Sequence, residues 1–166
     1  MRKMLPALVL ACLAALALTA GAQQRTPPPT TSGGSGEALL NLDNTIALHG
    51  YDPMAYFTER QPVKGNKRIL ERLGMATYYF ADRANRYEFL GNAPKYQPQL
   101  GGFCTTSMSL GRLEDIDPNV FVIYQGKLYL FRDLGAQAQF WTNPEMIIRD
   151  ATFHYFELAK KKRERW

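Results

Sequence analysis

The chain has 166 residues, of which 46% are hydrophobic and 12% aromatic, and its formal net charge at pH 7 is +5. This composition excludes an intrinsically disordered protein, because so large an apolar fraction can bury a core. The length fits a single domain once an N-terminal segment is set aside.

The N-terminal segment, residues 1–22, has the pattern of a secretory signal peptide. Arg2 and Lys3 precede an apolar run over residues 5–18, and an A-x-A cleavage site ends at Ala22. The apolar run is shorter than the roughly 20 residues that span a membrane. We therefore expect cleavage after Ala22, a periplasmic or secreted protein, and no transmembrane segment in the mature chain.

Cleavage at this site would leave a single cysteine, because it removes Cys12 and keeps Cys104. No intramolecular disulfide can then form. A lipoprotein acylated at Cys12 and an uncleaved N-terminal anchor are the alternatives. In an oxidising compartment a lone cysteine is buried and inert, bound to a metal, paired between chains or reactive. The role of Cys104 is therefore the central question about function.

Residues 23–37 have the composition of a flexible tether, with three consecutive prolines followed by a Gly/Ser run. We expect the folded domain to span residues 38–166. Near its start, the motif HGYDP at residues 49–53 predicts a turn, and residues 54–57 resume a buried segment. Residues 59–74 are polar and basic, which predicts a solvent-facing excursion.

The next stretch predicts a strand followed by a capped helix. Residues 76–81 have high β-propensity, with Tyr78 and Phe80 on one face. Asp82 is a good N-cap for a helix over residues 83–91. We expect this helix to turn three apolar side chains toward the core: Tyr87, Phe89 and Leu90.

Gly101 and Gly102 then interrupt the chain just ahead of Cys104. A glycine pair allows a close backbone approach or a positive φ. Residues 105–110 are expected to form a helix that places Cys104 in its first turn. A helix N-terminus stabilises a thiolate, so this position favours a reactive thiol.

A hairpin is predicted next, with apolar strands over residues 120–124 and 127–131 joined by Gln125-Gly126. Asp133 is expected to cap a short helix that reaches residues 140–141.

The final helix is predicted to open with a capping box from Thr142 to Glu145 and to run to the basic cluster at residues 160–163. Four side chains recur at helical spacing and should pack on the domain: Ile147, Ala151, Tyr155 and Leu158. The basic cluster either complements the helix dipole or contacts anionic headgroups or an acidic partner.

Several of these segments together resemble the YHS-domain family. The resemblance rests on GYDP at residues 50–53, YYF at 78–80, KY at 95–96 and GGFC at 101–104. It covers roughly residues 45–130 and looks like an exported bacterial branch, in which one YHS-like unit makes up most of the mature chain. It implies a small α+β domain, in which short strands and a hairpin pack against several short helices, with a C-terminal amphipathic helix added here.

The short form of this family, found in heavy-metal transport ATPases, looks like a metal binder through cysteines at set positions. The resemblance places Ala55, Ala81 and Asn85 at those positions. None of these side chains is a thiolate ligand. The resemblance therefore implies the family framework without the residues that would bind the metal.

Cys104 is then the candidate centre for any chemistry. Met108 follows four residues later on the same helical face, and a thiolate with a thioether suits Cu(I). His49 would add an imidazole to such a copper site, or act as a base toward Cys104 in a thiol-dependent enzyme or redox protein. The alternative is that Cys104 is buried and purely structural, with His49 a turn residue.

Other classes are excluded by the residues. One cysteine with two distant histidines does not make a structural zinc site, and neither G-x-S-x-G nor G-x-x-x-x-G-K occurs. The aromatic residues have core spacing and an exported protein rarely meets nucleic acid, so we expect no nucleic-acid partner.

We therefore expect a binding module, with no catalytic residues assigned. Its partner would be a metal ion such as copper, an unknown small ligand or a periplasmic protein, and the chain would be a monomer. A ligand groove, if present, is expected near four residues: Tyr51, Asp52, Tyr56 and Tyr78.

Overall fold

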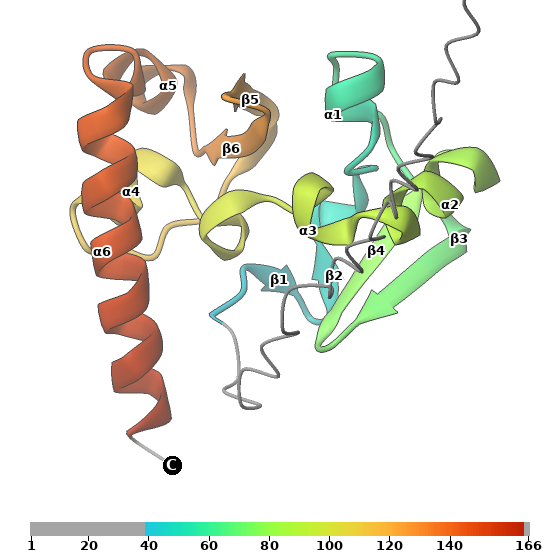
Figure 1. Ribbon diagram of the computed structural model, residues 1–166, viewed down its shortest axis with the longest axis horizontal. Coiled ribbons are helices and arrows are strands. Elements are labelled where there is room, and N and C mark those ends of the chain that lie inside the picture. The colour runs from blue at the N-terminus through green and yellow to red at the C-terminus, as the bar shows by residue number, and fades with distance from the viewer. Residues whose placement is uncertain (1–38, 165–166) are drawn as a thin grey trace, which may run out of the picture. The chain divides into compact units, whose positions relative to one another are not determined.

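The computed structural model describes residues 39–164, which belong to one compact unit (Figure 1). The predicted signal peptide over residues 1–22 and the tether over 23–37 lie outside the described residues. Helices and short strands both occur, so the predicted α+β class is confirmed. Between residues 39 and 164, no helix combines the length and the apolar character needed to cross a membrane.

One sheet has four strands in the order β1-β2-β4-β3. The strands are β1 (Leu42–Asp43), β2 (Ile46–Ala47), β3 (Asn66–Leu73) and β4 (Ala76–Phe80). β2 runs parallel to β4, and the other neighbours are antiparallel. The strand predicted over residues 76–81 is confirmed as β4.

Residues 59–74, predicted to be a solvent-facing excursion, contain no buried residue, but part of the stretch forms the strand β3. This strand is at the edge of the sheet, and most of its side chains are exposed. Alternating burial begins only at Ile69 and continues through Leu73. A polar edge strand of this kind gives little periodic signal in the sequence.

The first core lies between β4 and α2 (Arg83–Gly91). Phe89 packs against Tyr78 and Phe80, with ring centroids 5.1 Å apart in both pairs. The Asp82 carboxylate accepts the Asn85 N–H at 2.8 Å, which confirms the predicted N-cap.

Only one of the three α2 side chains expected in the core is buried. Tyr87 is 81% and Leu90 43% exposed. The cause is helical geometry, because each residue turns the helix by about 100° and three side chains within four positions cannot share one face. The short helix α3 (Ala93–Tyr96) follows directly.

The second core is built on the predicted hairpin, whose strands are β5 (Asp117–Tyr124) and β6 (Lys127–Phe131). The turn residues Gln125 and Gly126 have φ of 50° and 72°, the left-handed geometry that suits a two-residue hairpin. The predicted hairpin is confirmed.

Helix α5 (Leu134–Phe140) covers the hairpin. The Asp133 carboxylate caps it by accepting the Ala136 N–H at 2.7 Å, as predicted. Phe140 is completely buried and its ring centroid lies 5.2 Å from that of Phe131.

Helix α6 (Pro144–Arg163) buries Ile147 and Ala151 against the rest of the domain, whereas the other two predicted positions, Tyr155 and Leu158, are half-buried. Its N-cap is Asn143, whose side chain accepts the Met146 N–H at 3.1 Å. The predicted capping box was therefore placed one residue too early. Thr142 instead donates its hydroxyl to Gln139 O, which ends α5.

The two cores are connected by η1 (Leu48–Gly50), α1 (Ala55–Thr58), η2 (Gln99–Gly102) and α4 (Thr105–Ser109). Pro98 and Cys104 both form parallel bridges to β6, which brings η2 and α4 against the hairpin. The helix predicted over residues 105–110 ends at Ser109, and Cys104 is its N-cap residue.

Candidate functional site

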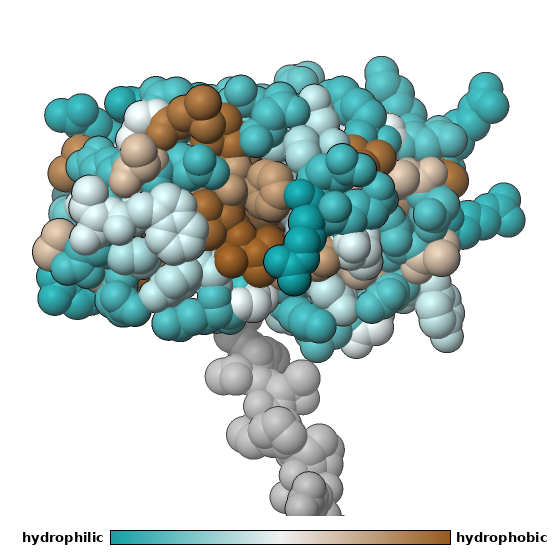
Figure 2. Space-filling view, turned by 90° about the horizontal axis from the view of Figure 1, so that it is seen from above, coloured by the Kyte–Doolittle hydropathy of each residue, from teal (hydrophilic) through white to brown (hydrophobic). Residues whose placement is uncertain are grey.

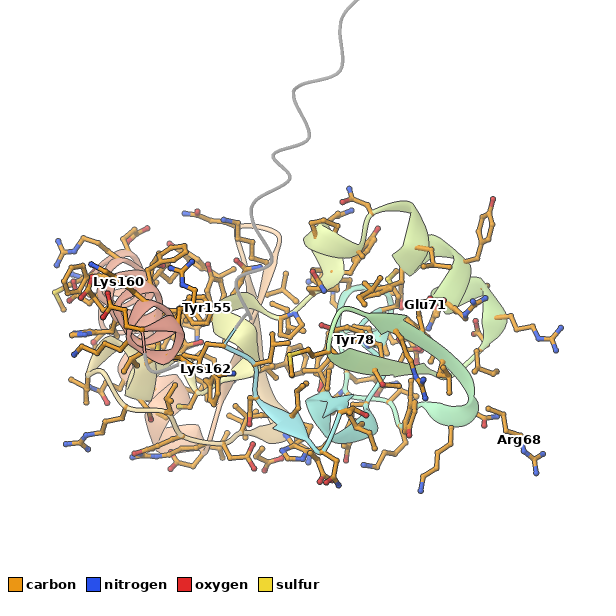
Figure 3. All side chains as sticks on the ribbon, turned by 90° about the horizontal axis from the view of Figure 1, so that it is seen from below. Arg68, Glu71, Tyr78, Tyr155, Lys160 and Lys162 are labelled. Atoms are coloured by element: carbon orange, nitrogen blue, oxygen red, sulfur yellow. The ribbon has the colours of Figure 1, made fainter. Side chains whose placement is uncertain are left out.

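A cleft of about 720 Å³ lies between the four-stranded sheet, η2 and α6. Its walls come from β1, β2, the β3–β4 turn, the α3–η2 segment and Tyr155 of α6. Figure 3 looks onto the domain from below and labels Tyr78 on the sheet and Tyr155 on α6. The cleft therefore brings together segments that are far apart in the sequence.

The lining of this cleft is neutral. Six of its side chains are long and apolar: Leu40, Leu42, Leu48, Leu73, Met75 and Leu100. None of the described residues that line it is Asp, Glu, Lys, Arg or His. A cleft of this composition favours an uncharged guest, because a charged one would lose hydration without finding an opposite charge.

The cleft holds one pair of adjoining polar side chains, Tyr78 and Gln97. The Gln97 amide donates to the Tyr78 hydroxyl at 3.3 Å, and Tyr78 is only 3% exposed. Burial raises the pKa of Tyr78, and the hydrogen bond from Gln97 offsets part of that rise. The tyrosine is thus neutral at physiological pH.

This pair retains unused hydrogen-bonding capacity. The Tyr78 proton and the Gln97 carbonyl oxygen have no partner in the described part of the chain. If the amide is turned over, the tyrosine donates to it and the NH₂ group becomes the spare donor. Either orientation therefore presents at least one donor and one acceptor to a guest.

Two turns of left-handed backbone border the cleft. The φ angles are 55°, 50° and 78° over residues 48–50, and 55°, 64° and 82° over residues 100–102. Leu48 and Leu100 both line the cleft and both have positive φ, which is unfavourable for a bulky residue. Strained backbone of this kind gathers at ligand sites more often than elsewhere.

The left-handed turn at residues 100–102 also contacts the first residues that the structure describes, residues 39–41. The Asn41 N–H donates to Gly101 O at 2.9 Å, and the Tyr155 hydroxyl donates to Leu39 O at 3.0 Å. A Cβ at Gly101 would lie 2.0 Å from Leu39 O. The close approach and positive φ predicted for the Gly101–Gly102 pair are confirmed.

The four residues expected to form one groove lie in different places. Tyr78 lines the cleft, whereas Tyr56 lines two smaller hollows of about 510 and 310 Å³. Tyr51 and Asp52 line none of these three. Both smaller hollows include Arg60 and residues of α1 and β5. Seen from above, the domain shows hydrophilic surface directly beside apolar surface (Figure 2).

Asp52 has a structural role instead. It is fully buried, and its carboxylate accepts three hydrogen bonds: Met54 N–H at 2.8 Å, Ala81 N–H at 2.8 Å and the Asn85 amide at 2.7 Å. The bond from Met54 closes an Asx turn. Ala81 and Asn85 stand where the YHS resemblance places cysteines, and the structure brings both to this carboxylate.

Cys104 and Met108 are both fully buried. The Ser107 hydroxyl lies 3.2 Å from Cys104 Sγ and 2.7 Å from Glu114 Oε2. A hydroxyl has one proton, and the carboxylate is the nearer and stronger acceptor, so we assign that proton to Glu114. The Cys104 thiol is then left to donate to the serine oxygen.

Glu114 is held as a carboxylate at this position. The hydrogen bond from Arg132, followed by that from Ser107, lowers the pKa of Glu114 below its ordinary value. Ser107 thus links the Cys104 sulfur to the Glu114 carboxylate.

The His49 side chain is paired with Asp115. Its Nε2 lies 2.9 Å from Asp115 Oδ1, and 32% of its side chain is exposed. Burial alone would raise the pKa of Asp115, but hydrogen bonds from Asn41, Ile116 N–H and His49 bring it below the ordinary value. Within residues 39–164, no group of three or more His, Cys, Asp or Glu side chains is placed to hold a metal ion.

Alkylation of the thiol tests the environment of Cys104. Because its side chain is fully buried, we expect iodoacetamide to label Cys104 in the folded protein at less than about a tenth of the rate in urea. Peptide mass spectrometry separates Cys104 from Cys12 where the full chain is present. Rapid labelling of folded protein would contradict the structural interpretation and favour the predicted thiol chemistry.

The comparisons with known proteins add no family. Comparison with protein-family models, a search of curated proteins and a search of solved structures each find no match. The YHS resemblance therefore stays a prediction from the residues that carry it.

Proposed function

We propose that this domain is a binding module that takes a small, neutral, mainly apolar molecule into the cleft between the sheet, η2 and α6. The observation that carries the proposal is an uncharged cleft of about 720 Å³ with one polar pair, Tyr78 and Gln97. Ligand sites typically enclose about 300–1,000 Å³ and combine apolar walls with a few polar groups that fix orientation.

The chemistry of the lining favours binding over catalysis. Its side chains offer apolar contact and hydrogen bonding, and the Tyr78–Gln97 pair is suited to a carbonyl, hydroxyl or amide on the guest. The left-handed turns at residues 48–50 and 100–102 support a cleft formed before the guest arrives, which lowers the entropy lost on binding.

Copper binding and thiol chemistry at Cys104 remain predictions of the sequence. So does export, which would place the cleft in the periplasm or outside the cell. The neutral-ligand proposal stands apart from all three, because Cys104, Met108 and His49 do not line the cleft.

Titration with prodan, a neutral naphthalene ketone whose emission depends on polarity and hydrogen bonding, tests the proposal. We expect saturable binding with blue-shifted emission. Tyr78→Phe should weaken binding about two- to tenfold, because one hydrogen bond contributes about 0.5–1.5 kcal/mol. The emission of the bound probe should move further to the blue, because its carbonyl loses a donor.

Tyr129→Phe is the matched control. Tyr129 is also buried, 4% exposed, but it belongs to the hairpin core and does not line the cleft. The Tyr129→Phe substitution should leave prodan binding unchanged. Absence of saturable binding to the wild type, or equal effects of the two substitutions, would count against the proposed site.

A further inference from the structure

The outward face of α6 carries two exposed phenylalanines. Phe153 is 62% and Phe156 64% exposed, while Ala151 of the same helix is fully buried. They follow Ala151 by two and five residues, which places them about 200° and 140° around the helix from it. Figure 1 shows α6 at the left edge of the domain, with α4, α5 and the hairpin on its inner side.

These rings belong to a stripe that is basic at one end. Met146, Phe153, Phe156, Lys160 and Arg163 are separated by steps that keep them on one side of the helix, and all are exposed. The last turn of α6 contains four basic residues in succession, Lys160–Arg163. Over residues 157–164 basic side chains outnumber acidic ones.

The remaining charges of this face are partly balanced. Arg149 also lies on the stripe, but it is paired with its neighbour Asp150 at 2.8 Å. Glu157 and Glu164 are exposed beside the basic cluster. The surplus positive charge is therefore concentrated at Lys160–Arg163, one turn beyond the two rings.

The loop at residues 110–113, which lies beside α6, adds exposed apolar and basic side chains to this surface. Gly111 lies against His154 of α6, since a Cβ at Gly111 would be 3.3 Å from His154 Nδ1. The residues around this contact include Leu110, 57% exposed, and Leu113, 46% exposed. Arg112 between them is exposed as well.

A second copy of this chain fits the stripe poorly. A parallel pairing of two α6 helices would set Lys160 against Lys160 and Arg163 against Arg163. An antiparallel pairing centred on the rings would set Lys160 against Arg149. Either register brings like charges together in the seam, which weakens the pairing.

We propose that the stripe formed by Phe153, Phe156, Lys160 and Arg163 docks on the surface of a bilayer that contains anionic lipid. The two rings enter the boundary between headgroups and acyl chains, and the basic side chains reach the phosphates. A bilayer suits this face because the rings project from a convex helix, whereas a protein partner would have to supply a matching groove. The positive charge accounts for the preference for anionic headgroups.

Sedimentation with vesicles tests the proposal, using the full chain expressed with its N-terminal segment. The vesicles contain either phosphatidylcholine alone or a mixture with phosphatidylglycerol. We expect binding to the mixed vesicles that weakens with salt, and at least about tenfold weaker binding to the neutral ones. Phe153→Ser with Phe156→Ser should lower the partition coefficient about tenfold or more, as should Lys160→Gln with Arg163→Gln.

Matched controls come from the other side of the domain. Tyr87→Ser removes an aromatic ring that is 81% exposed on α2, and Lys67→Gln with Arg68→Gln removes two exposed charges from β3. Both should bind vesicles like the wild type. Any N-terminal segment left uncleaved is common to all variants, so differences between variants report on α6.

Several results would overturn the proposal. It fails if the protein does not sediment with the mixed vesicles, if it binds the neutral vesicles equally well, or if the control substitutions weaken binding as much as the substitutions on α6. Retention on immobilised polyglutamate without vesicle binding would assign the face to an acidic protein. A dimer in analytical ultracentrifugation that the phenylalanine substitutions dissociate would assign it to a second copy.

Discussion

Replacing Asp52 by alanine is expected to lower the free energy of unfolding by about 3–5 kcal/mol. The carboxylate is fully buried and accepts from Met54 N–H, Ala81 N–H and the Asn85 amide. Alanine would remove the acceptor of all three donors, of which the Met54 N–H is buried and the other two are half-buried. Each hydrogen bond to a charged group contributes about 1.5–3 kcal/mol, and the loss of the buried charge offsets part of the sum.

Urea unfolding followed by circular dichroism measures this change, with an unchanged m-value as the sign that the unfolded state is the same. Asp52→Asn should also destabilise, because one orientation of its amide points a donor at Ala81 N–H and the other at Met54 N–H. Asp43→Ala is the control, since Asp43 is exposed and, among the described residues, its side chain is hydrogen-bonded only to Asn44, at 3.4 Å. A loss below about 1 kcal/mol for Asp52→Ala would show that the cluster is not a structural anchor.

The parts of the fold that could be predicted from the sequence are those specified by neighbouring residues. Asp82 and Asp133 each cap the helix that follows because a short carboxylate reaches the backbone N–H three residues on. Gln125-Gly126 forms the hairpin turn because the geometry of that turn favours glycine at its second position. These signals need no knowledge of tertiary contacts.

The edge strand β3 and the cap of α6 show where local signals fail. In β3, pairing with β4 decides the conformation, and its exposed polar side chains carry no clear alternation. At the start of α6, Thr142 and Asn143 are both good cap residues. The choice between them depends on how α5 ends, because Thr142 is engaged by Gln139 O.

The candidate site was predictable only in part. Tyr78 could be singled out as an aromatic residue on a strand, and the Gly101–Gly102 pair as a place of unusual backbone. The left-handed backbone at Leu48 could not, because a bulky apolar side chain disfavours a positive φ. The cleft itself depends on contacts between Leu39, Gly101 and Tyr155, which are remote in sequence.

Gly101→Ala is expected to destabilise the domain by about 2–5 kcal/mol and to abolish prodan binding. Two penalties act together. An alanine at φ 64° costs about 1–2 kcal/mol relative to glycine. Its Cβ would also lie 2.0 Å from Leu39 O and 3.2 Å from Tyr155 Cε2, and overpacking of this kind costs about 1–3 kcal/mol.

Relief of this clash has to move the backbone of Leu39 or of Gly101 itself, because Leu39 O belongs to the main chain. Either movement displaces residues that form the cleft, including Leu40 and Asn41. Gly126→Ala separates the two penalties, since Gly126 has φ 72° but nothing within 4 Å of its added Cβ. That control should lose only the 1–2 kcal/mol or so of backbone strain and keep prodan binding. Equal losses of stability in the two variants would show that the approach of Leu39 to Gly101 does not hold the cleft together.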